Sequence, residues 1–312
     1  MTARMLRWLL LAQALAGALL ALAGWHWLGL SALAAALFGL GAVLLVRLAL
    51  TANNFVLSRR YASPVPDGFR LDAAARVCLF FGEFYATMVQ SSWIMPRARA
   101  CVRIHPDAPL PPVLLLHGYG CNSGYWAHLE PLLEARGISH AGLDLEPTLA
   151  GIDEFVPLVQ QGVERLLAAT GAARVILVAH SMGGLVARAY LRSHGSARIA
   201  RLITLGTPHH GTALAAFAPG RNAAQMRRSP ATGAESDWLR ELAAAETPAT
   251  RALVTSLLTH HDNIIAPQSS SILEGARNIG FGGVGHVALG RDRAVLACVL
   301  EEIEAARRPV FV

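Results

Sequence analysis

The chain has 312 residues, enough for one large domain beside a shorter N-terminal segment. Its net charge is +6 and all 27 basic residues are arginines, but they are scattered and accompany no recognition motif, which argues against nucleic-acid binding. The four cysteines fit neither a disulfide-rich scaffold nor a CxxC metal pattern, so we expect free thiols at Cys78, Cys101, Cys121 and Cys298.

The N-terminal segment carries most of the excess apolar character of the chain. Hydrophobic residues make up 54% of the sequence, and residues 8–24 and 28–46 form two nearly uninterrupted apolar runs. Each run is close to the ~20 residues that a helix needs to cross a bilayer. Residues 25–27, Trp-His-Trp, suit an interfacial turn with aromatic anchors. We therefore predict a transmembrane helical hairpin over residues 1–50.

The alternative for the first run is a cleaved signal peptide, because two arginines precede it and residues 21–23 (Ala-Leu-Ala) resemble a cleavage site. Arginines flank the hairpin at Arg4, Arg7, Arg47, Arg59 and Arg60, whereas the link between the runs has none. Because flanking arginines stay on the cytoplasmic side, we expect both ends of the hairpin in the cytoplasm. The expected location is a bacterial inner (cytoplasmic) membrane, with the following domain on its cytoplasmic side.

Residues 51–100 are expected to join the hairpin to the main domain. Residues 58–67 are polar and contain proline, which predicts a short linker. In residues 71–90, apolar side chains recur at roughly helical spacing and predict a juxtamembrane amphipathic helix. This helix could lie on the bilayer surface or pack against the domain, and the pattern favours neither.

Residues 101–312 alternate between short apolar runs and amphipathic stretches. The runs predict strands over residues 112–117, 138–143, 174–179, 199–205, 253–258 and 276–281. The stretches between them predict helices over residues 152–169, 182–194 and 291–307. Short apolar strands separated by helices indicate an α/β fold, with a mostly parallel sheet covered on both faces.

The strongest local signal is the segment Ala179-His180-Ser181-Met182-Gly183, in which a strand ends at a serine and a helix begins at once. A sharp strand-to-helix turn lifts the serine hydroxyl out of the sheet and needs small residues two positions before and after it. Ala179 and Gly183 meet this need. The turn also places the Met182 N–H at a helix N-terminus, where negative charge is stabilised. We identify Ser181 as a candidate nucleophile and Met182 as an oxyanion donor.

A second segment, His117-Gly118-Tyr119-Gly120, directly follows a predicted strand some sixty residues before the serine. Acyl transfer needs a second N–H donor for the developing oxyanion, and a flexible loop at a strand end can supply it. We assign this role to the backbone N–H of Tyr119.

These motifs, with LGTPHHGT at residues 205–212, resemble the α/β-hydrolase superfamily, and more narrowly its bacterial lipase and esterase group. The resemblance covers about residues 110–295. It implies an α/β-hydrolase fold in which nucleophile, acid and histidine follow in that order along the chain. The acid is expected after a late strand, and the histidine in a loop after the last strand.

Following that order, Asp262 comes directly after a predicted strand, and His286 lies in a glycine-rich loop before the final helix. In such a triad the histidine takes the serine proton and later protonates the leaving group, while the acid orients the histidine and stabilises its charged form. Other candidates for the acid are Asp144, Asp153 and Glu274.

The adjacent pair His209 and His210 raises the question of a metal site. Adjacent histidines do not readily point both rings at one ion, and no HExxH pattern or cysteine cluster accompanies them. We therefore predict no metal and no cofactor. Residues 213–250 form an insertion with scattered apolar side chains, which we expect to form a helical cap over the serine; the alternative is a helical excursion without gating.

The sequence thus predicts a membrane-anchored carboxylic ester hydrolase of the lipase or esterase type, with an acyl ester or lipid, including a phospholipid, as substrate. One alternative is a non-catalytic α/β-hydrolase-like membrane protein that binds a lipid or a protein partner. The other is an acyltransferase or thioesterase, because the same side chains attack any activated acyl carbon.

Overall fold

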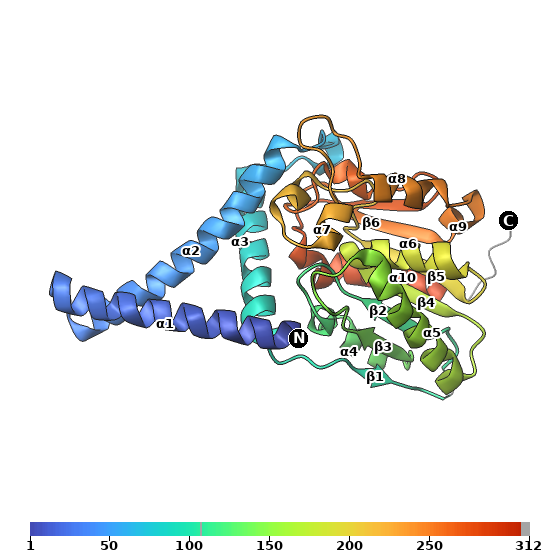
Figure 1. Cartoon of the computed structure of the whole chain (residues 1–312), viewed down its shortest axis with the longest axis horizontal. Coiled ribbons are helices and arrows are strands. Elements are labelled where there is room, and N and C mark those ends of the chain that lie inside the picture. The colour runs from blue at the N-terminus through green and yellow to red at the C-terminus, as the bar shows by residue number, and fades with distance from the viewer. Residues whose placement is uncertain (107, 307–312) are drawn as a thin grey trace.

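A computed structural model describes residues 1–106 and 108–306, so residue 107 and the last six residues of the predicted domain lie outside it. Residue 307, the predicted end of the final helix, is among them. The chain begins with two long helices, α1 (Thr2–Leu28) and α2 (Ala32–Arg60), which project from the rest of the molecule (Figure 1). Both are long and apolar enough to cross a membrane.

The turn between α1 and α2 lies later than predicted. Residues 25–27 belong to the last turn of α1, so the expectation that they form the link is wrong. Gly29 ends the helix in the left-handed conformation (φ 64°), which glycine adopts without steric cost. Ser31 then starts α2 by accepting a hydrogen bond from the N–H of Ala34. These capping residues determine where the turn falls.

Small residues bring the two helices into close contact. A Cβ atom at Gly39 would collide with the carbonyl oxygen of Gly17, so the backbones meet at this point. The start of α1 touches the main domain, where the N–H of Thr2 donates to Glu146 Oε1 at 2.6 Å. The end of α2 also lies beside the domain (Figure 1). Both ends of the hairpin are therefore on the same side.

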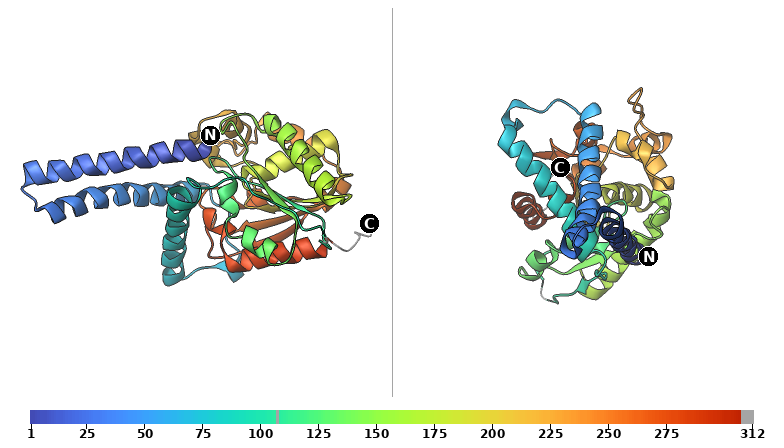
Figure 2. Two further views of the ribbon diagram at one scale, coloured as in Figure 1. Left: turned by 90° about the horizontal axis from the view of Figure 1, so that it is seen from below. Right: turned by 90° about the vertical axis from the view of Figure 1, so that its left-hand side faces the viewer.

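Helix α3 (Ala73–Val89) stands between the hairpin and the domain (Figures 1 and 2). One face, with Leu79, Glu83 and Ala86, is buried, so α3 packs against the domain as one of the two alternatives expected. It also carries exposed apolar side chains, including Phe81 and Tyr85. A five-residue π-helix, Gln90–Ile94, continues it.

The domain is built on a seven-stranded sheet in the order β1-β3-β2-β4-β5-β6-β7, parallel except for β1. All six predicted strands are present at or near their expected positions. The two-residue edge strand β1 was not predicted, because it is too short to leave a pattern. The strands are β1 (Val102–Arg103), β2 (Val113–Leu116), β3 (His140–Leu143), β4 (Val175–His180), β5 (Ile199–Leu205), β6 (Val254–Thr259) and β7 (Arg277–Phe281).

Helices cover both faces of the sheet. Leu114 and Leu116 of β2 pack in one core with the helices α5 and α6, whereas Val113 and Leu115 pack in a second core with α10. This two-residue alternation follows from the pleat of a strand. The covering helices are α4 (Glu130–Glu134), α5 (Val156–Thr170), α6 (Met182–His194) and α10 (Arg293–Ala305).

The predicted insertion between β5 and β6 forms short helices rather than a single long one. The 3-10 helix Ala213–Phe217 comes first and α2 passes close to it. The helices that follow are α7 (Arg221–Gln225), α8 (Asp237–Ala244) and α9 (Pro248–Ala252). Because the strands are parallel, the loops after β2, β4, β6 and β7 all leave the same edge of the sheet, where the predicted site residues lie.

Candidate active site

Ser181 occupies a strained turn between β4 and α6. Its φ is 53°, and it is the one non-glycine residue with a positive φ in the described part of the chain. Such strain is typical of a serine presented at the top of a sheet. A Cβ atom at Gly183 would lie 2.6 Å from the carbonyl oxygens of Leu116 and His117. Close contact with the end of β2 therefore requires a glycine at position 183, two residues after the serine.

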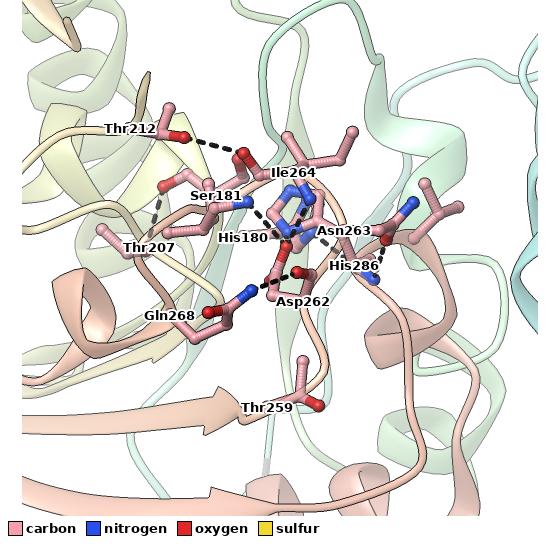
Figure 3. A network of polar contacts seen from close by, with 12 residues as sticks. His180, Ser181, Thr207, Thr212, Thr259, Asp262, Asn263, Ile264, Gln268 and His286 are labelled. Atoms are coloured by element: carbon pink, nitrogen blue, oxygen red, sulfur yellow. Dashed lines mark hydrogen bonds and ion pairs between the residues drawn. The ribbon is translucent and has the colours of Figure 1, made fainter. Parts of the chain in front are cut away.

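Asp262 follows β6, and both of its carboxylate oxygens are used. Oδ2 lies 2.8 Å from Nδ1 of His286. Oδ1 accepts hydrogen bonds from the backbone N–H groups of Ile264 at 2.8 Å and Ile265 at 2.7 Å. The side chain is buried, and these bonds hold the carboxylate in one orientation toward the imidazole (Figure 3).

His286 is buried in the loop after β7, and its backbone N–H donates to Asn263 Oδ1 at 3.0 Å. Burial alone would lower the pKa of His286, but the charge of Asp262, the hydrogen bond to it and the charge of Glu83 raise the pKa above its ordinary value. A carboxylate at Nδ1 requires the proton on that nitrogen, so Nε2 is left to accept a proton.

Ser181 lies beside this pair. Its N–H donates to the carbonyl of Leu205 at 2.8 Å, and a Cβ atom at the next residue, Gly206, would lie 3.2 Å from His286 Nδ1 and 3.3 Å from Asp262 Oδ2. Within the described residues, the Ser181 hydroxyl forms no hydrogen bond with the imidazole. Catalytic hydrogen bonds often tighten only in the presence of substrate. The structure thus brings the acid and the histidine into contact and the serine next to them.

The two predicted oxyanion donors flank the serine. Met182 is the first residue of α6, and among the described groups neither its N–H nor that of Tyr119 donates a hydrogen bond. The loop after β2 is pressed against the serine, since a Cβ atom at Gly118 would lie 2.9 Å from Ser181 Cβ. His117 anchors this loop, because its Nε2 accepts from the N–H of Leu145 at 2.9 Å. Two free N–H groups beside a hydroxyl are suited to stabilise an oxyanion.

The other candidates for the acid lie elsewhere. Asp144 accepts a hydrogen bond from the N–H of Ser123 at 2.7 Å. Asp153 pairs with Arg192 at 2.6 Å, and Glu274 is exposed. None of the three has a hydrogen bond to His286 among the described residues.

In residues 1–106 and 108–306, no group of three or more His, Cys, Asp or Glu side chains is arranged so that it could hold a metal ion. His209 is buried beside Thr204 and Ser256, and His210 pairs with Glu235 at 2.8 Å. The two rings thus face different partners. Cys121 follows the loop of residues 117–120, and burial raises the pKa of its thiol to about 12, so it carries little of the reactive thiolate.

Two residues beside the site were missed by the sequence reasoning. The His180 ring stacks on Tyr125 at 3.9 Å and its centroid lies 4.6 Å from that of the His286 ring, so it packs against the imidazole of His286. Glu83 of α3 is buried, and its carboxylate accepts the N–H groups of Val287 and Ala288, both at 2.9 Å. Glu83 is the one acid in the largely apolar helix α3, which marks it as unusual in the sequence but does not indicate its partners.

An apolar cavity of about 340 Å³ opens beside Tyr119, in the loop after β2. Its walls come from Tyr119, from the insertion and from the end of α2; they include Asn54, Leu57, Leu214, Phe217, Ala218, Met226 and Ile264. A second cavity, of about 270 Å³, lies between α1, α2 and α3 and shares Asn54 and Ile264 with the first. The hairpin thus forms part of the surroundings of the site.

The structure places a strained serine between a strand and a helix, next to a histidine that contacts an acid. The acid and the histidine follow later strands of the same parallel sheet. This arrangement is typical of the α/β-hydrolase class of proteins. Residues 111–284 match the family model of the alpha/beta hydrolase fold, more than half of the chain. The chain belongs to this family.

Among individual relatives, a triacylglycerol lipase of Pseudarthrobacter phenanthrenivorans is 33% identical over 119 residues, 34% of this chain and 35% of that protein. A triacylglycerol lipase of Burkholderia plantarii is likewise 33% identical over 119 residues, 34% of this chain and 32% of that protein. The match therefore spans about a third of the length of these relatives.

Solved structures show the same fold at low identity. The mature Bacillus licheniformis lipase BlEst2 superposes with a TM-score of 0.56 at 18% identity, over 66% of this chain and 97% of that chain. Aspergillus fumigatus lipase B gives a TM-score of 0.55 at 17% identity, over 65% of this chain and 56% of that chain. At such identities the likeness concerns the fold alone.

Proposed function

We propose that this protein is a membrane-anchored lipase or esterase that cleaves carboxylic esters through Ser181, His286 and Asp262. The observation that carries the proposal is the buried 2.8 Å contact between His286 Nδ1 and Asp262 Oδ2, next to the strained turn at Ser181. The partial identity to triacylglycerol lipases supports the same chemistry.

In the proposed mechanism, His286 Nε2 takes the proton of the Ser181 hydroxyl while its oxygen attacks the acyl carbon. The carbonyl oxygen gains negative charge, which the N–H groups of Tyr119 and Met182 stabilise. The charged imidazole then gives its proton to the leaving alcohol. Water, activated by the same nitrogen, releases the acid from the acyl-enzyme and restores the serine.

A lipid is the substrate class that the surroundings of the site favour. The apolar cavity beside Tyr119 is lined both by the insertion at residues 213–250, the proposed cap, and by α2. An acyl chain from the bilayer would reach this cavity along α2, with its ester next to the oxyanion donors. Triglycerides and phospholipids both carry such chains.

The proposed organisation is an N-terminal hairpin in the membrane, a juxtamembrane helix α3 and a hydrolase domain from about residue 101 onward. Arginines flank the hairpin and none lies in its turn, which supports a domain on the cytoplasmic side of a bacterial inner membrane. The contact of Thr2 with Glu146 is consistent with both ends of the hairpin on that side.

The proposal is tested by an ester panel on the full chain purified in detergent. Ser181→Ala is expected to lose p-nitrophenyl ester hydrolysis while folding normally, and Ser196→Ala, a serine in the loop after α6, serves as the control. Full activity of Ser181→Ala would overturn the nucleophile assignment.

The acyl cavity has its own variant. Ala218→Phe fills the cavity beside Tyr119, so activity on long-chain esters should fall at least tenfold, since ~0.8 kcal/mol of burial is lost for each excluded CH₂. Activity on p-nitrophenyl acetate should remain. Equal losses on short and long esters would contradict the assignment of this cavity to the acyl chain.

A further inference from the structure

The mechanism above leaves one buried acid unused. Glu83 is 1% exposed and comes from α3, outside the segment that matches the family model. Its Oε1 accepts the N–H of Val287 and its Oε2 accepts the N–H of Ala288, both at 2.9 Å. These are the two residues directly after His286. Both oxygens of the carboxylate are thus bound to the loop that carries the proposed base.

The loop is shaped to receive this side chain. A Cβ atom at Gly285, the residue before His286, would lie 2.5 Å from Glu83 Oε2, so glycine leaves the space that the carboxylate fills. His286 is also the N-cap of the 3-10 helix Val287–Gly290, whose first N–H groups need acceptors. Glu83 therefore contacts the loop on both sides of the histidine.

The charge of Glu83 has few partners. Within the described residues no arginine forms an ion pair with it, and the charged or titratable groups that act on it are His286, which favours its anionic form, and Asp262, which opposes it. Charged side chains that line the same cavities as Glu83 are Arg47 of α2, and Arg291, Asp292 and Arg293 at the start of α10. Burial raises the pKa of Glu83 above its ordinary value, and the N–H donors of Val287 and Ala288 on its two oxygens oppose this rise and favour the carboxylate form.

We propose that Glu83 is a positioning residue: its carboxylate fixes the loop of His286 and adds a second negative charge that stabilises the imidazolium formed during ester cleavage. The inference rests on the proposed role of His286. It means that α3, the element between the hairpin and the domain, completes the active site.

The electrostatic consequence has a definite sign. In the described part of the chain, the titratable groups around the His286 ring are Asp262 at Nδ1, Glu83 on the other side of the loop, and the buried His180. Burial lowers the pKa of His180 well below its ordinary value. The charge of Glu83 raises the pKa of His286. Since only the neutral imidazole can take the serine proton, removal of this charge should extend activity to lower pH while reducing the maximal rate.

The test measures the rate at which a fluorophosphonate labels Ser181 in the detergent-purified full chain, as a function of pH. In the wild-type protein the labelling rate should fall at acidic pH, and we call this part of the profile the acid limb. We expect Glu83→Gln to move the midpoint of the acid limb down by about one pH unit, the smallest pKa shift typical of a nearby opposite charge. The plateau rate should fall about tenfold, since one pKa unit corresponds to that factor. Glu302→Gln removes another buried carboxylate, paired with Arg201 at 2.8 Å, and should leave the acid limb unmoved.

A second variant keeps the test decisive if Glu83→Gln does not fold. Gly285→Ala displaces the carboxylate without removing its charge, and should lower the plateau about tenfold with a smaller shift of the limb. Gly82→Ala, where a Cβ atom meets nothing within 4 Å, is its control.

The outcomes separate the two proposals. If the wild-type protein is not labelled at Ser181, the proposed function fails. If it is labelled, but the folded Glu83→Gln keeps the wild-type acid limb or Gly285→Ala keeps the wild-type rate, the role of Glu83 fails alone.

Discussion

Replacement of Asp262 by asparagine separates the charge of the acid from its shape. The new side chain could keep its oxygen toward the N–H groups of Ile264 and Ile265, which in the wild-type protein donate to Asp262 Oδ1 at 2.8 Å and 2.7 Å. Its NH₂ group would then face His286 Nδ1 in place of the oxygen 2.8 Å away. Because an NH₂ group only donates, Nδ1 would have to accept and the proton would move to Nε2.

An imidazole with its proton on Nε2 cannot take the proton of Ser181. We therefore expect Asp262→Asn to lower kcat by ~10⁴, the loss seen when a triad histidine is held in the wrong tautomer, with KM little changed. The bonds to the backbone remain, so the thermal unfolding midpoint should stay close to wild type. Initial rates on a p-nitrophenyl ester and an unfolding curve measure both effects.

The control is Glu274→Gln, which neutralises an exposed acid that the sequence alone left as an alternative. It should keep wild-type kcat. A folded Asp262→Asn that retains more than a tenth of the wild-type kcat would refute the assignment, as would an equal loss in Glu274→Gln.

Three further predictions concern pH and packing. Because the surrounding carboxylates raise the pKa of His286 and the base must be neutral, kcat/KM should fall on acidification through a midpoint above the ordinary 6.5, and a midpoint below it would contradict this. Glu246→Ala leaves the buried Arg188 without the carboxylate that it contacts at 2.6 Å, so unfolding free energy should drop by about 3–5 kcal/mol; a denaturation midpoint equal to wild type would speak against it. Gly39→Val should loosen the α1–α2 contact and lower the thermal stability of the protein in detergent. Gly41→Val should not, because a Cβ atom at Gly41 has no neighbour within 4 Å. Equal losses of stability in the two variants would contradict a close contact of the helices at Gly39.

The fold was readable from the sequence where apolar runs were long and uniform. Strand β4 is buried along its whole length and β5 from Leu202 onward, so both leave apolar runs in the sequence, and the loops after them carry the motifs that indicate the fold family. The candidate nucleophile could be found because Ala179 and Gly183, two residues before and after Ser181, meet the steric requirement of the turn.

Other features depend on tertiary contacts that leave no local pattern. The hairpin turn was misplaced because residues 25–27 are compatible with both a helix and an interfacial turn, and the helix end is set by the left-handed Gly29. Glu83 could not be assigned, since its partners Val287 and Ala288 are more than two hundred residues away in the chain. Only the packing of α3 against the loop of His286 brings them together.

The most direct measurement is mass-spectrometric mapping of a fluorophosphonate adduct on the full-length protein. We predict a single adduct on the peptide that contains Ser181, absent from Ser181→Ala and strongly reduced in a His286→Ala variant. An adduct on a different residue, or none on a folded and lipid-embedded sample, would contradict the account.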